Sequence, residues 1–261
     1  MSSPEAVRNV PDPQIVAFPS GSLTLKGLLW KPIENGNLPA VLFNHGSEPS
    51  AWEGGYSTFA SWFVRHGYVL FIPFRRGHNL SSDQGPYIGA LLDQTRAEEG
   101  DEAWSRLMVS LLEGDHLNDQ LAALSYLKTL PFVDDNRVAV AGGSFGGIQV
   151  VLAAEAATSI RAAVDFAGAS MTWAHSELLR QRMLVAVRNA RCPIYFIQAE
   201  NDFDVSPSRV LAAEMQRLGK PHRITIFPPF GETAMDGHLL GSRGGDIWEQ
   251  EVFAFLADSM K

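Results

Sequence analysis

The stretch Ala141-Gly142-Gly143-Ser144-Phe145-Gly146-Gly147 decides the fold. It follows the apolar run 137–141, and it precedes residues 148–157, which are rich in alanine and other apolar residues and predict a helix. A serine between small residues, where a strand turns into a helix, is the pattern of a nucleophile elbow. Side chains at Gly142 or Gly146 would collide with neighbouring elements in so sharp a turn. We therefore expect the serine to be strained, with its Oγ exposed beside backbone N–H groups of the helix start.

The composition is that of a soluble globular protein, with 46% hydrophobic and 19% charged residues among 261. No apolar run is long enough to span a bilayer, and the N-terminus has no charged-then-apolar leader, so we expect a cytoplasmic protein. The formal net charge is −8 and the basic residues are scattered, which argues against a nucleic-acid partner. The single cysteine, Cys192, excludes internal disulfides and thiolate metal clusters.

Short apolar runs alternate with helical patterns along the chain, which predicts an α/β fold. We expect one domain over residues 1–261, with a mostly parallel sheet of eight strands and helices on both faces. The expected strands cover residues 14–18, 23–30, 39–44, 68–73, 137–141, 161–167, 193–198 and 222–227. The expected helices cover residues 56–66, 117–130, 148–157, 176–189, 207–218 and 246–260. The first two strands are predicted to form an antiparallel hairpin at the sheet edge.

An insertion of residues 79–114 follows the fourth strand, because one crossover helix, residues 117–130, is enough to reach the fifth. Apolar residues from Trp104 to Leu112 recur at helical spacing behind the acidic run 98–102. The insertion is either a surface helix packed on the domain or a helical cap over the active site. It lies on the ligand-binding side of an open α/β sheet in both cases, because it follows the C-terminal end of a strand.

A serine nucleophile needs a histidine to accept its proton and a carboxylate to orient that histidine. Behind an elbow of this kind the chain order is serine, acid, histidine, each after a strand. His238 is the histidine that follows the last strand, on an expected loop. Three carboxylates follow the preceding strand, namely Glu200, Asp202 and Asp204, and their spacing alone does not separate them.

Backbone N–H groups are expected to stabilise the oxyanion that forms when Ser144 attacks a carbonyl. One donor is predicted from Phe145, directly after the nucleophile, and the other from Ser47, in the His45-Gly46-Ser47 loop after the third strand. We interpret His45 as a structural residue hydrogen-bonded inside that loop. Further candidates for substrate contact are Trp173, Met171, His175, Trp104, Arg75 and Glu48. For four of these candidates a core or surface role is an equal alternative to substrate contact: Trp173, Met171, His175 and Trp104. For Arg75 a structural ion pair is favoured.

Five segments in order carry a resemblance: Asn44-His45-Gly46-Ser47, Phe74-Arg75-Arg76-Gly77-His78, the elbow, Asn201-Asp202-x-x-Val205-x-Pro207 and Asp236-Gly237-His238. On these segments the chain resembles an α/β-hydrolase of the dienelactone hydrolase and prolyl-oligopeptidase-like group. The resemblance implies the α/β-hydrolase fold, and it selects Asp202 as the catalytic acid. Dienelactone hydrolases proper have cysteine where this chain has Ser144. Oligopeptidases of the group carry a large propeller, for which 261 residues leave no room.

The resulting hypothesis is a serine esterase that hydrolyses small carboxylic esters through an acyl-enzyme, with the triad Ser144, Asp202 and His238. No metal or organic cofactor is expected, and the expected partner is a small-molecule ester rather than nucleic acid or a membrane. The sequence leaves the oligomeric state open, a homodimer included. A peptidase or amidase with the same triad is the main alternative, and an acyltransferase or a non-catalytic binding relative is a lesser one.

Overall fold

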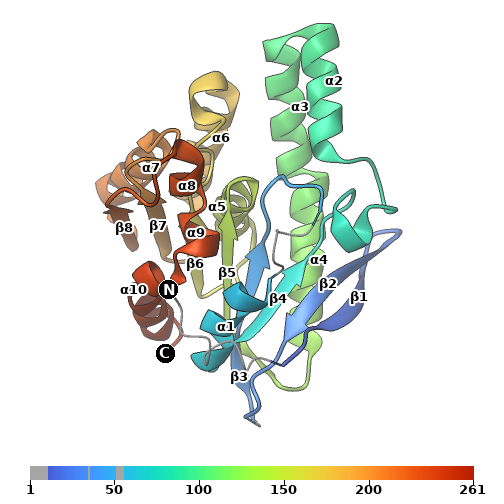
Figure 1. Ribbon diagram of the computed structural model, residues 1–261, viewed down its shortest axis with the longest axis vertical. Helices are drawn as coiled ribbons and strands as arrows, with labels where there is room; N and C mark the ends of the chain where they lie inside the picture. Colours follow the sequence, from blue (N-terminus) through green and yellow to red (C-terminus); the bar gives the residue numbers. More distant parts are fainter. Residues whose placement is uncertain (1–10, 35, 51–55) are drawn as a thin grey trace.

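The computed structural model describes residues 11–34, 36–50 and 56–261, and its strands form one sheet in the order β1-β2-β4-β3-β5-β6-β7-β8 (Figure 1). The strands are β1 Gln14–Ser20, β2 Leu23–Trp30, β3 Leu38–Asn44, β4 Val69–Pro73, β5 Val133–Gly143, β6 Ala162–Phe166, β7 Ile194–Ala199 and β8 His222–Phe227. Pairs β1–β2 and β2–β4 are antiparallel, and all the other neighbouring pairs are parallel. The predicted mostly parallel sheet with an edge hairpin is confirmed.

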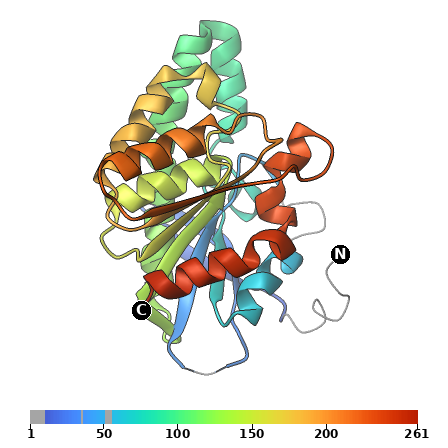
Figure 2. The ribbon, with the colours of Figure 1, turned by 90° about the vertical axis from the view of Figure 1, so that its left-hand side faces the viewer.

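Helices cover both faces of this sheet, as Figure 2 shows edge-on. One face carries α4 Asp115–Thr129, α5 Phe145–Ala156, α6 Glu177–Asn189 and α7 Ser206–Arg217, and the other carries α1 Ser57–Arg65 and α10 Gly245–Ser259. The central strands are buried on both sides, so their side chains divide between two hydrophobic cores. Among the described residues, none of the helices is both long and apolar enough to cross a membrane.

The core beneath α1 and α10 is built from aromatic rings. Trp248 of α10 is fully buried and lies edge-on to Trp62 of α1, with ring centroids 5.4 Å apart. Its ring also lies 5.0 Å from Phe166, at the end of β6. A side chain at Gly245, where α10 begins, would collide with the Trp62 ring, so glycine allows α10 to approach α1 this closely. This packing anchors the last helix of the chain to the sheet.

The insertion after β4 forms a 3₁₀ turn, η2 Asn79–Ser81, and then two helices, α2 Ile88–Glu99 and α3 Asp101–Glu113. The two helices form a hairpin that rises beyond the C-terminal ends of the strands (Figure 1). The apolar spacing in the sequence indicated α3. It did not indicate α2 as a separate helix, because only Ile88 and Leu92 of α2 are buried. α3 is tied to α6 by a hydrogen bond between Ser105 and Ser176.

Replacing Trp248 by alanine is expected to lower the free energy of unfolding by about 3–5 kcal/mol, because it leaves a large cavity between α10, α1 and β6. Urea denaturation measures this change. The matched control is Ile247→Ala, one residue earlier on the same helix, where the side chain is 47% exposed and the change should stay within about 0.5 kcal/mol. Equal effects of the two substitutions would contradict this account of the core.

Candidate active site

Ser144 stands at the turn between β5 and α5 with φ 57° and ψ −120°, a conformation that costs a non-glycine residue free energy. The neighbouring glycines make the turn possible. A Cβ on Gly146 would lie 2.0 Å from the Asn44 carbonyl oxygen, and one on Gly142 would lie 2.5 Å from the Gly146 carbonyl oxygen. The backbone of the elbow therefore packs directly against the end of β3. The local geometry predicted from the glycine-rich stretch is present.

Asp202 and His238 come together in the folded chain. The loop after β7 holds Asp202 and the segment after β8 holds His238, and His238 Nδ1 lies 3.0 Å from Asp202 Oδ1. Both side chains are almost completely buried. His238 ends a short helix, α8 Ala234–His238, rather than lying on an open loop as we expected. A capping box at Thr233 and Asp236 starts this helix, and five residues are too few to show a periodicity in the sequence.

The geometry separates Asp202 from the two other carboxylates of its loop. Glu200 is exposed, and the Asp204 carboxylate accepts a hydrogen bond from the Ser206 N–H at the start of α7. Asp202 alone of the three contacts a histidine among the described residues. The hydrogen bonds of the described residues do not include one from Ser144 Oγ to the His238 ring, and such bonds are often long before substrate binds.

Two residues that sequence reasoning missed hold the Asp202 carboxylate. Ser170 Oγ donates to Asp202 Oδ1 at 2.6 Å, and Gln198 Nε2 donates to Asp202 Oδ2 at 2.8 Å. The N–H of Phe203 also donates to Oδ1, at 2.7 Å. These donors fix the direction of the carboxylate toward the histidine. Gln198 is a polar residue near the end of an apolar strand, four residues before the acid. This was the one feature of the sequence that could have indicated the support for Asp202.

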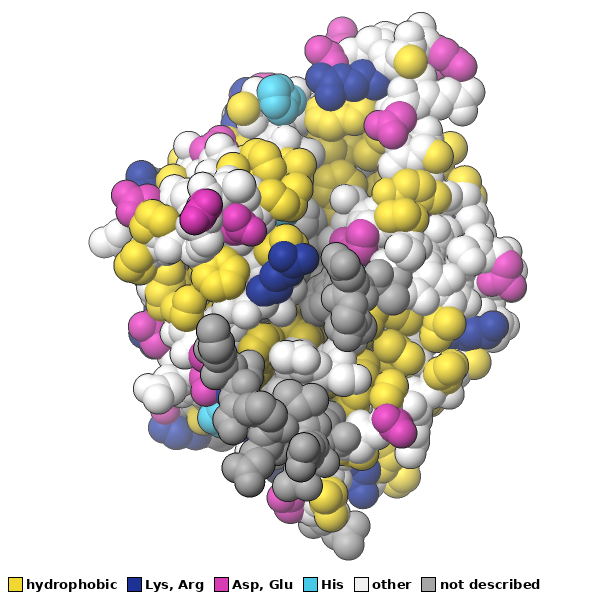
Figure 3. All heavy atoms as spheres, in the orientation of Figure 1, with side chains coloured by type: hydrophobic (Ala, Val, Ile, Leu, Met, Phe, Trp, Pro, Cys, Tyr) yellow, Lys and Arg dark blue, Asp and Glu magenta, His cyan; other side chains and the backbone are white. Residues whose placement is uncertain are grey.

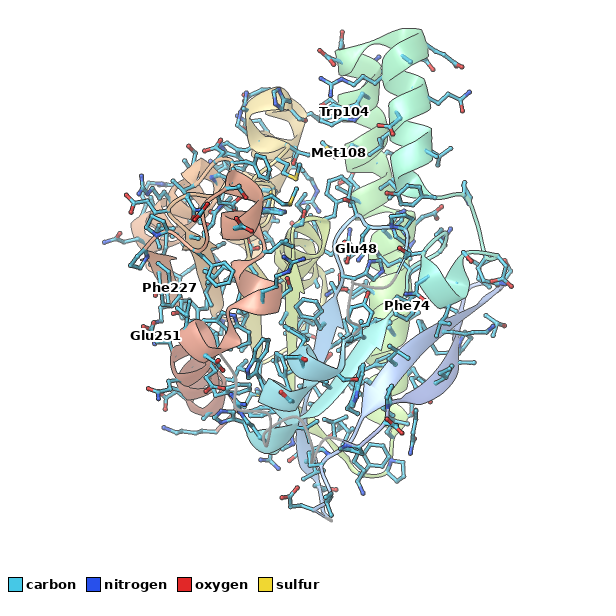
Figure 4. All side chains as sticks on the ribbon, viewed as in Figure 1. Glu48, Phe74, Trp104, Met108, Phe227 and Glu251 are labelled. Carbon is cyan, nitrogen blue, oxygen red and sulfur yellow. The ribbon has the colours of Figure 1, made fainter. Side chains whose placement is uncertain are left out.

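The predicted oxyanion donors belong to the first residue of α5 and to the loop after β3. Phe145 is the first residue of α5, so its N–H has no acceptor within the helix. Ser47 follows Gly46, whose added Cβ would lie 3.4 Å from the Ser144 Cβ and 2.5 Å from Glu48 Oε2. The loop after β3 thus runs beside the serine, and the carboxylate of Glu48, which Figure 4 labels, lies on the same side of Gly46 as Ser144. Tyr87 of the insertion donates from its hydroxyl to the Ser47 carbonyl at 2.6 Å.

Arg75, for which a structural ion pair was favoured over contact with a substrate, hydrogen-bonds two backbone carbonyl groups. Its side chain is 2% exposed and points into the protein beneath the oxyanion loop. Nη1 donates to the His45 carbonyl at 2.9 Å, and Nη2 donates to the Gly46 carbonyl at 2.7 Å. Burial lowers the pKa of Arg75 to about 10, which leaves it protonated at neutral pH. The neighbouring Arg76 forms the ion pair that we had expected of this segment, with Asp115 and Asp119.

Three buried histidines surround the Arg75 guanidinium. The rings of His45 and His78 are 4.8 Å apart, and those of His78 and His116 are 5.8 Å apart. Burial, and then the charge of Arg75, lowers the pKa of each, to about 4 for His78 and about 2 for His116. All three are therefore neutral near pH 7. His45 is a structural residue, as interpreted, since its ring nitrogens lie within hydrogen-bonding reach of the Gly46 carbonyl and the Arg75 N–H.

The remaining candidates for substrate contact lie at different depths. Figure 3 shows a hollow on the active-site side, between the α2–α3 hairpin and the α6–α8 side, with hydrophobic side chains along its walls. Trp104 and Met108 lie on the side of α3 that faces α6, where both are buried (Figure 4). Met171 is exposed and directly follows Ser170, whereas Trp173 is buried within the 3₁₀ turn η3 Trp173–His175. His175, at the end of that turn, is exposed.

Within the described ranges there is no group of three or more His, Cys, Asp or Glu side chains arranged to hold a metal ion. A strained serine, a buried carboxylate–histidine pair and amide donors on two sides are the parts needed for acyl transfer.

A protein-family model described as the dienelactone hydrolase family matches residues 27–232, which include the elbow, the oxyanion loop and Asp202. The chain belongs to the dienelactone hydrolase family. Its sheet order, its elbow and the helices on both faces are those of an α/β-hydrolase fold, as the sequence predicted.

Individual relatives of this family member include peptidases. It is 26% identical over 244 residues to the uncharacterized peptidase YtmA of Bacillus subtilis, a match that covers 82% of this chain and 84% of the relative. It is 25% identical over 228 residues to dipeptidyl-peptidase 5 of Porphyromonas gingivalis, covering 75% of this chain and 30% of that one. Among solved structures, puromycin hydrolase matches with a TM-score of 0.73 and 17% identity, over 99% of this chain and 40% of that chain, which shows a shared fold alone. This family member thus spans less than half the length of two of these relatives.

Beneath the elbow of this family member lies a buried carboxyl group that the triad does not use. Asp165 of β6 accepts one hydrogen bond, from the Gly168 N–H at 2.8 Å, and Asp165 Oδ2 has no hydrogen-bond partner among the described residues. Added Cβ atoms on Gly147 or Gly168 would collide with this carboxyl group, so both glycines make room for it. Burial raises the pKa of Asp165 to about 7.

Asp165→Asn is expected to change how stability depends on pH. As the pH rises from about 4 to 7, the unfolded chain releases the Asp165 proton while the folded protein keeps it, so the wild type loses stability and the asparagine variant does not. The difference in free energy of unfolding, variant minus wild type, should rise by up to about 1.4 kcal/mol per pH unit and level off above pH 7. Urea denaturation of both proteins from pH 5 to 8 measures this difference. The contributions of the buried histidines to the pH dependence cancel, because both proteins contain them. A constant difference would contradict the raised pKa.

Proposed function

We propose that this protein is a serine esterase that hydrolyses small carboxylic esters through an acyl-enzyme intermediate. Two observations carry the proposal: His238 and Asp202 form a buried hydrogen-bonded pair, and Ser144 has the strained conformation of a nucleophile elbow. Family membership supports hydrolysis, since dienelactones are cyclic esters. The peptidase relatives make an amide or peptide substrate the second candidate for the same residues.

In the proposed mechanism His238 accepts the proton of Ser144 while Oγ attacks the ester carbonyl carbon. Asp202 holds the Nδ1–H tautomer of His238 and stabilises the imidazolium that forms. The N–H groups of Ser47 and Phe145 donate to the oxyanion of the tetrahedral intermediate. His238 then protonates the leaving alcohol, and the ester carbon remains bonded to Oγ. A water molecule, deprotonated by His238, attacks this acyl-enzyme and releases the acid and the free serine.

The surroundings of the nucleophile favour a substrate with a modest apolar group. Hydrophobic side chains line the walls of the hollow above the sheet (Figure 3), and Met171, which is exposed beyond β6, is proposed to border it, whereas Met108 of α3 is fully buried. The α2–α3 hairpin is proposed to act as a cap on this hollow, consistent with its position beyond the C-terminal ends of the strands. The Phe203 ring lies edge-on to His238, with centroids 5.7 Å apart, and is 46% exposed, so it is placed to contact bound substrate.

The Ser144→Ala variant should lose hydrolysis of a p-nitrophenyl ester by a factor on the order of 10⁶ in kcat, because it removes the nucleophile. Asp202→Asn should lose roughly 10⁴, because it disturbs the histidine tautomer. Glu200→Gln and Asp204→Asn, on the same loop, serve as controls and should stay within about threefold of wild type, since neither carboxylate touches the histidine. Wild-type turnover in Ser144→Ala would overturn the proposal.

Ester and amide hydrolysis are separated by matched substrates with the same acyl group. We expect the p-nitrophenyl ester to be cleaved at least about a hundredfold faster than the p-nitroanilide, because an amine leaving group depends more strongly on protonation by His238. The ratio of kcat/KM values measures the preference. Equal or faster cleavage of the anilide would favour the peptidase candidate over the esterase.

A further inference from the structure

We infer that Arg75 is a positioning residue for the oxyanion hole, holding the peptide between Gly46 and Ser47 so that the Ser47 N–H faces the nucleophile. The inference rests on the proposed function, in which that N–H is one of the two donors to the oxyanion. Arg75 touches neither the triad nor the hollow above it, because its side chain is buried beneath the loop. Its influence on the reaction passes through the backbone of that loop.

The contacts of the guanidinium are made to two successive carbonyl groups of the oxyanion loop. Nη1 donates to the His45 carbonyl at 2.9 Å, and Nη2 donates to the Gly46 carbonyl at 2.7 Å. The Arg75 N–H also lies 3.3 Å from His45 Nε2, so backbone and side chain of one residue hold the same loop. Hydrogen bonds from a charged donor are about twice as strong as those between neutral groups, and these are buried from water.

The direction of the Ser47 N–H follows from the geometry of the peptide bond. The described chain has no cis peptide bonds, so the C=O and N–H of the peptide joining Gly46 to Ser47 point in opposite directions. With the Gly46 carbonyl held by Arg75 beneath the loop, the Ser47 N–H must point to the other side. Gly46 lies against Ser144 there, since a Cβ on Gly46 would be 3.4 Å from the Ser144 Cβ. If this peptide rotated, a carbonyl oxygen would replace the donor and repel the oxyanion.

The charge of Arg75 adds to this effect. A cation bound to the Gly46 carbonyl polarises the whole peptide unit and makes the Ser47 N–H a better donor. The histidines around Arg75 are neutral, whereas the carboxylates of Glu48 and Asp119 interact with its charge. Tyr87, from the insertion, holds the next carbonyl, that of Ser47. The loop is thus fixed from below by Arg75 and from the side by Tyr87, which leaves its amide edge for the reacting carbonyl.

Arg75→Ala and Arg75→Lys test the inference on the full chain. The alanine variant should lose about 10- to 100-fold in kcat toward the p-nitrophenyl ester, with KM changed by less than about threefold, because the lost donor acts mainly in the transition state. Affinity for a trifluoromethyl ketone, which forms an oxyanion on Ser144, should fall by the same factor as kcat. Arg75→Lys retains one donor and the charge, so it should recover part of the loss. Guanidinium chloride at millimolar concentration should partly restore the alanine variant, by filling the vacated site.

The matched control is Arg137→Ala, since Arg137 also donates to a backbone carbonyl, that of Asn37, but near the opposite end of β5 from the serine. It should keep wild-type kcat and ketone affinity and show no guanidinium effect. The inference is overturned if Arg75→Lys folds and both kcat and ketone affinity equal those of wild type, or if its losses lie in KM alone. Failure of the proposed function is a separate result, because wild type would then show no turnover that depends on Ser144.

Discussion

The close approach of the elbow to the end of β3 is the constraint on which the active site depends. Gly146 stands so near the Asn44 carbonyl that no side chain fits, and the Gly142 position is equally closed. This contact requires the positive φ of Ser144 and brings the nucleophile next to the loop that begins at His45. A single steric condition thus fixes the serine, the start of α5 and one wall of the oxyanion hole together.

Buried polar groups at the C-terminal ends of the strands support this arrangement. Ser170 and Gln198 hold Asp202, and Arg75 holds the loop after β3, each from beneath the reacting groups. Burial without partners would be costly, so each of these groups has a defined orientation set by its hydrogen bonds. The catalytic groups themselves need only to face the hollow above the sheet. Rigidity in the buried layer supplies the preorganisation that stabilisation of an oxyanion requires.

Family membership informs the general class of the protein, and the individual relatives inform the choice between ester and amide substrates. Membership of the dienelactone hydrolase family establishes a hydrolase with this fold. Two individual relatives are peptidases, and the matches to dipeptidyl-peptidase 5 and to puromycin hydrolase cover only a minor part of those longer proteins. The choice between ester and amide therefore rests on the surroundings of the nucleophile, above all on the walls of the hollow and the α2–α3 hairpin, and these are features of this chain.

The sequence by itself determined the strand order along the chain, the elbow and the triad candidates, because these depend on local patterns: apolar runs, glycines around a serine and the order of polar residues after strands. It missed α2, whose periodicity is weak, and it placed His238 on a loop because α8 is one short turn. It left Asp202 and its two neighbours equivalent until a family resemblance was invoked. Only the tertiary structure decided which carboxylate meets the histidine, that Ser170 and Gln198 support it, and that Arg75 turns inward to the oxyanion loop. Most of those contacts join residues 29 to 36 positions apart, and the one between Gln198 and Asp202 depends on side-chain direction, so no local pattern encodes them.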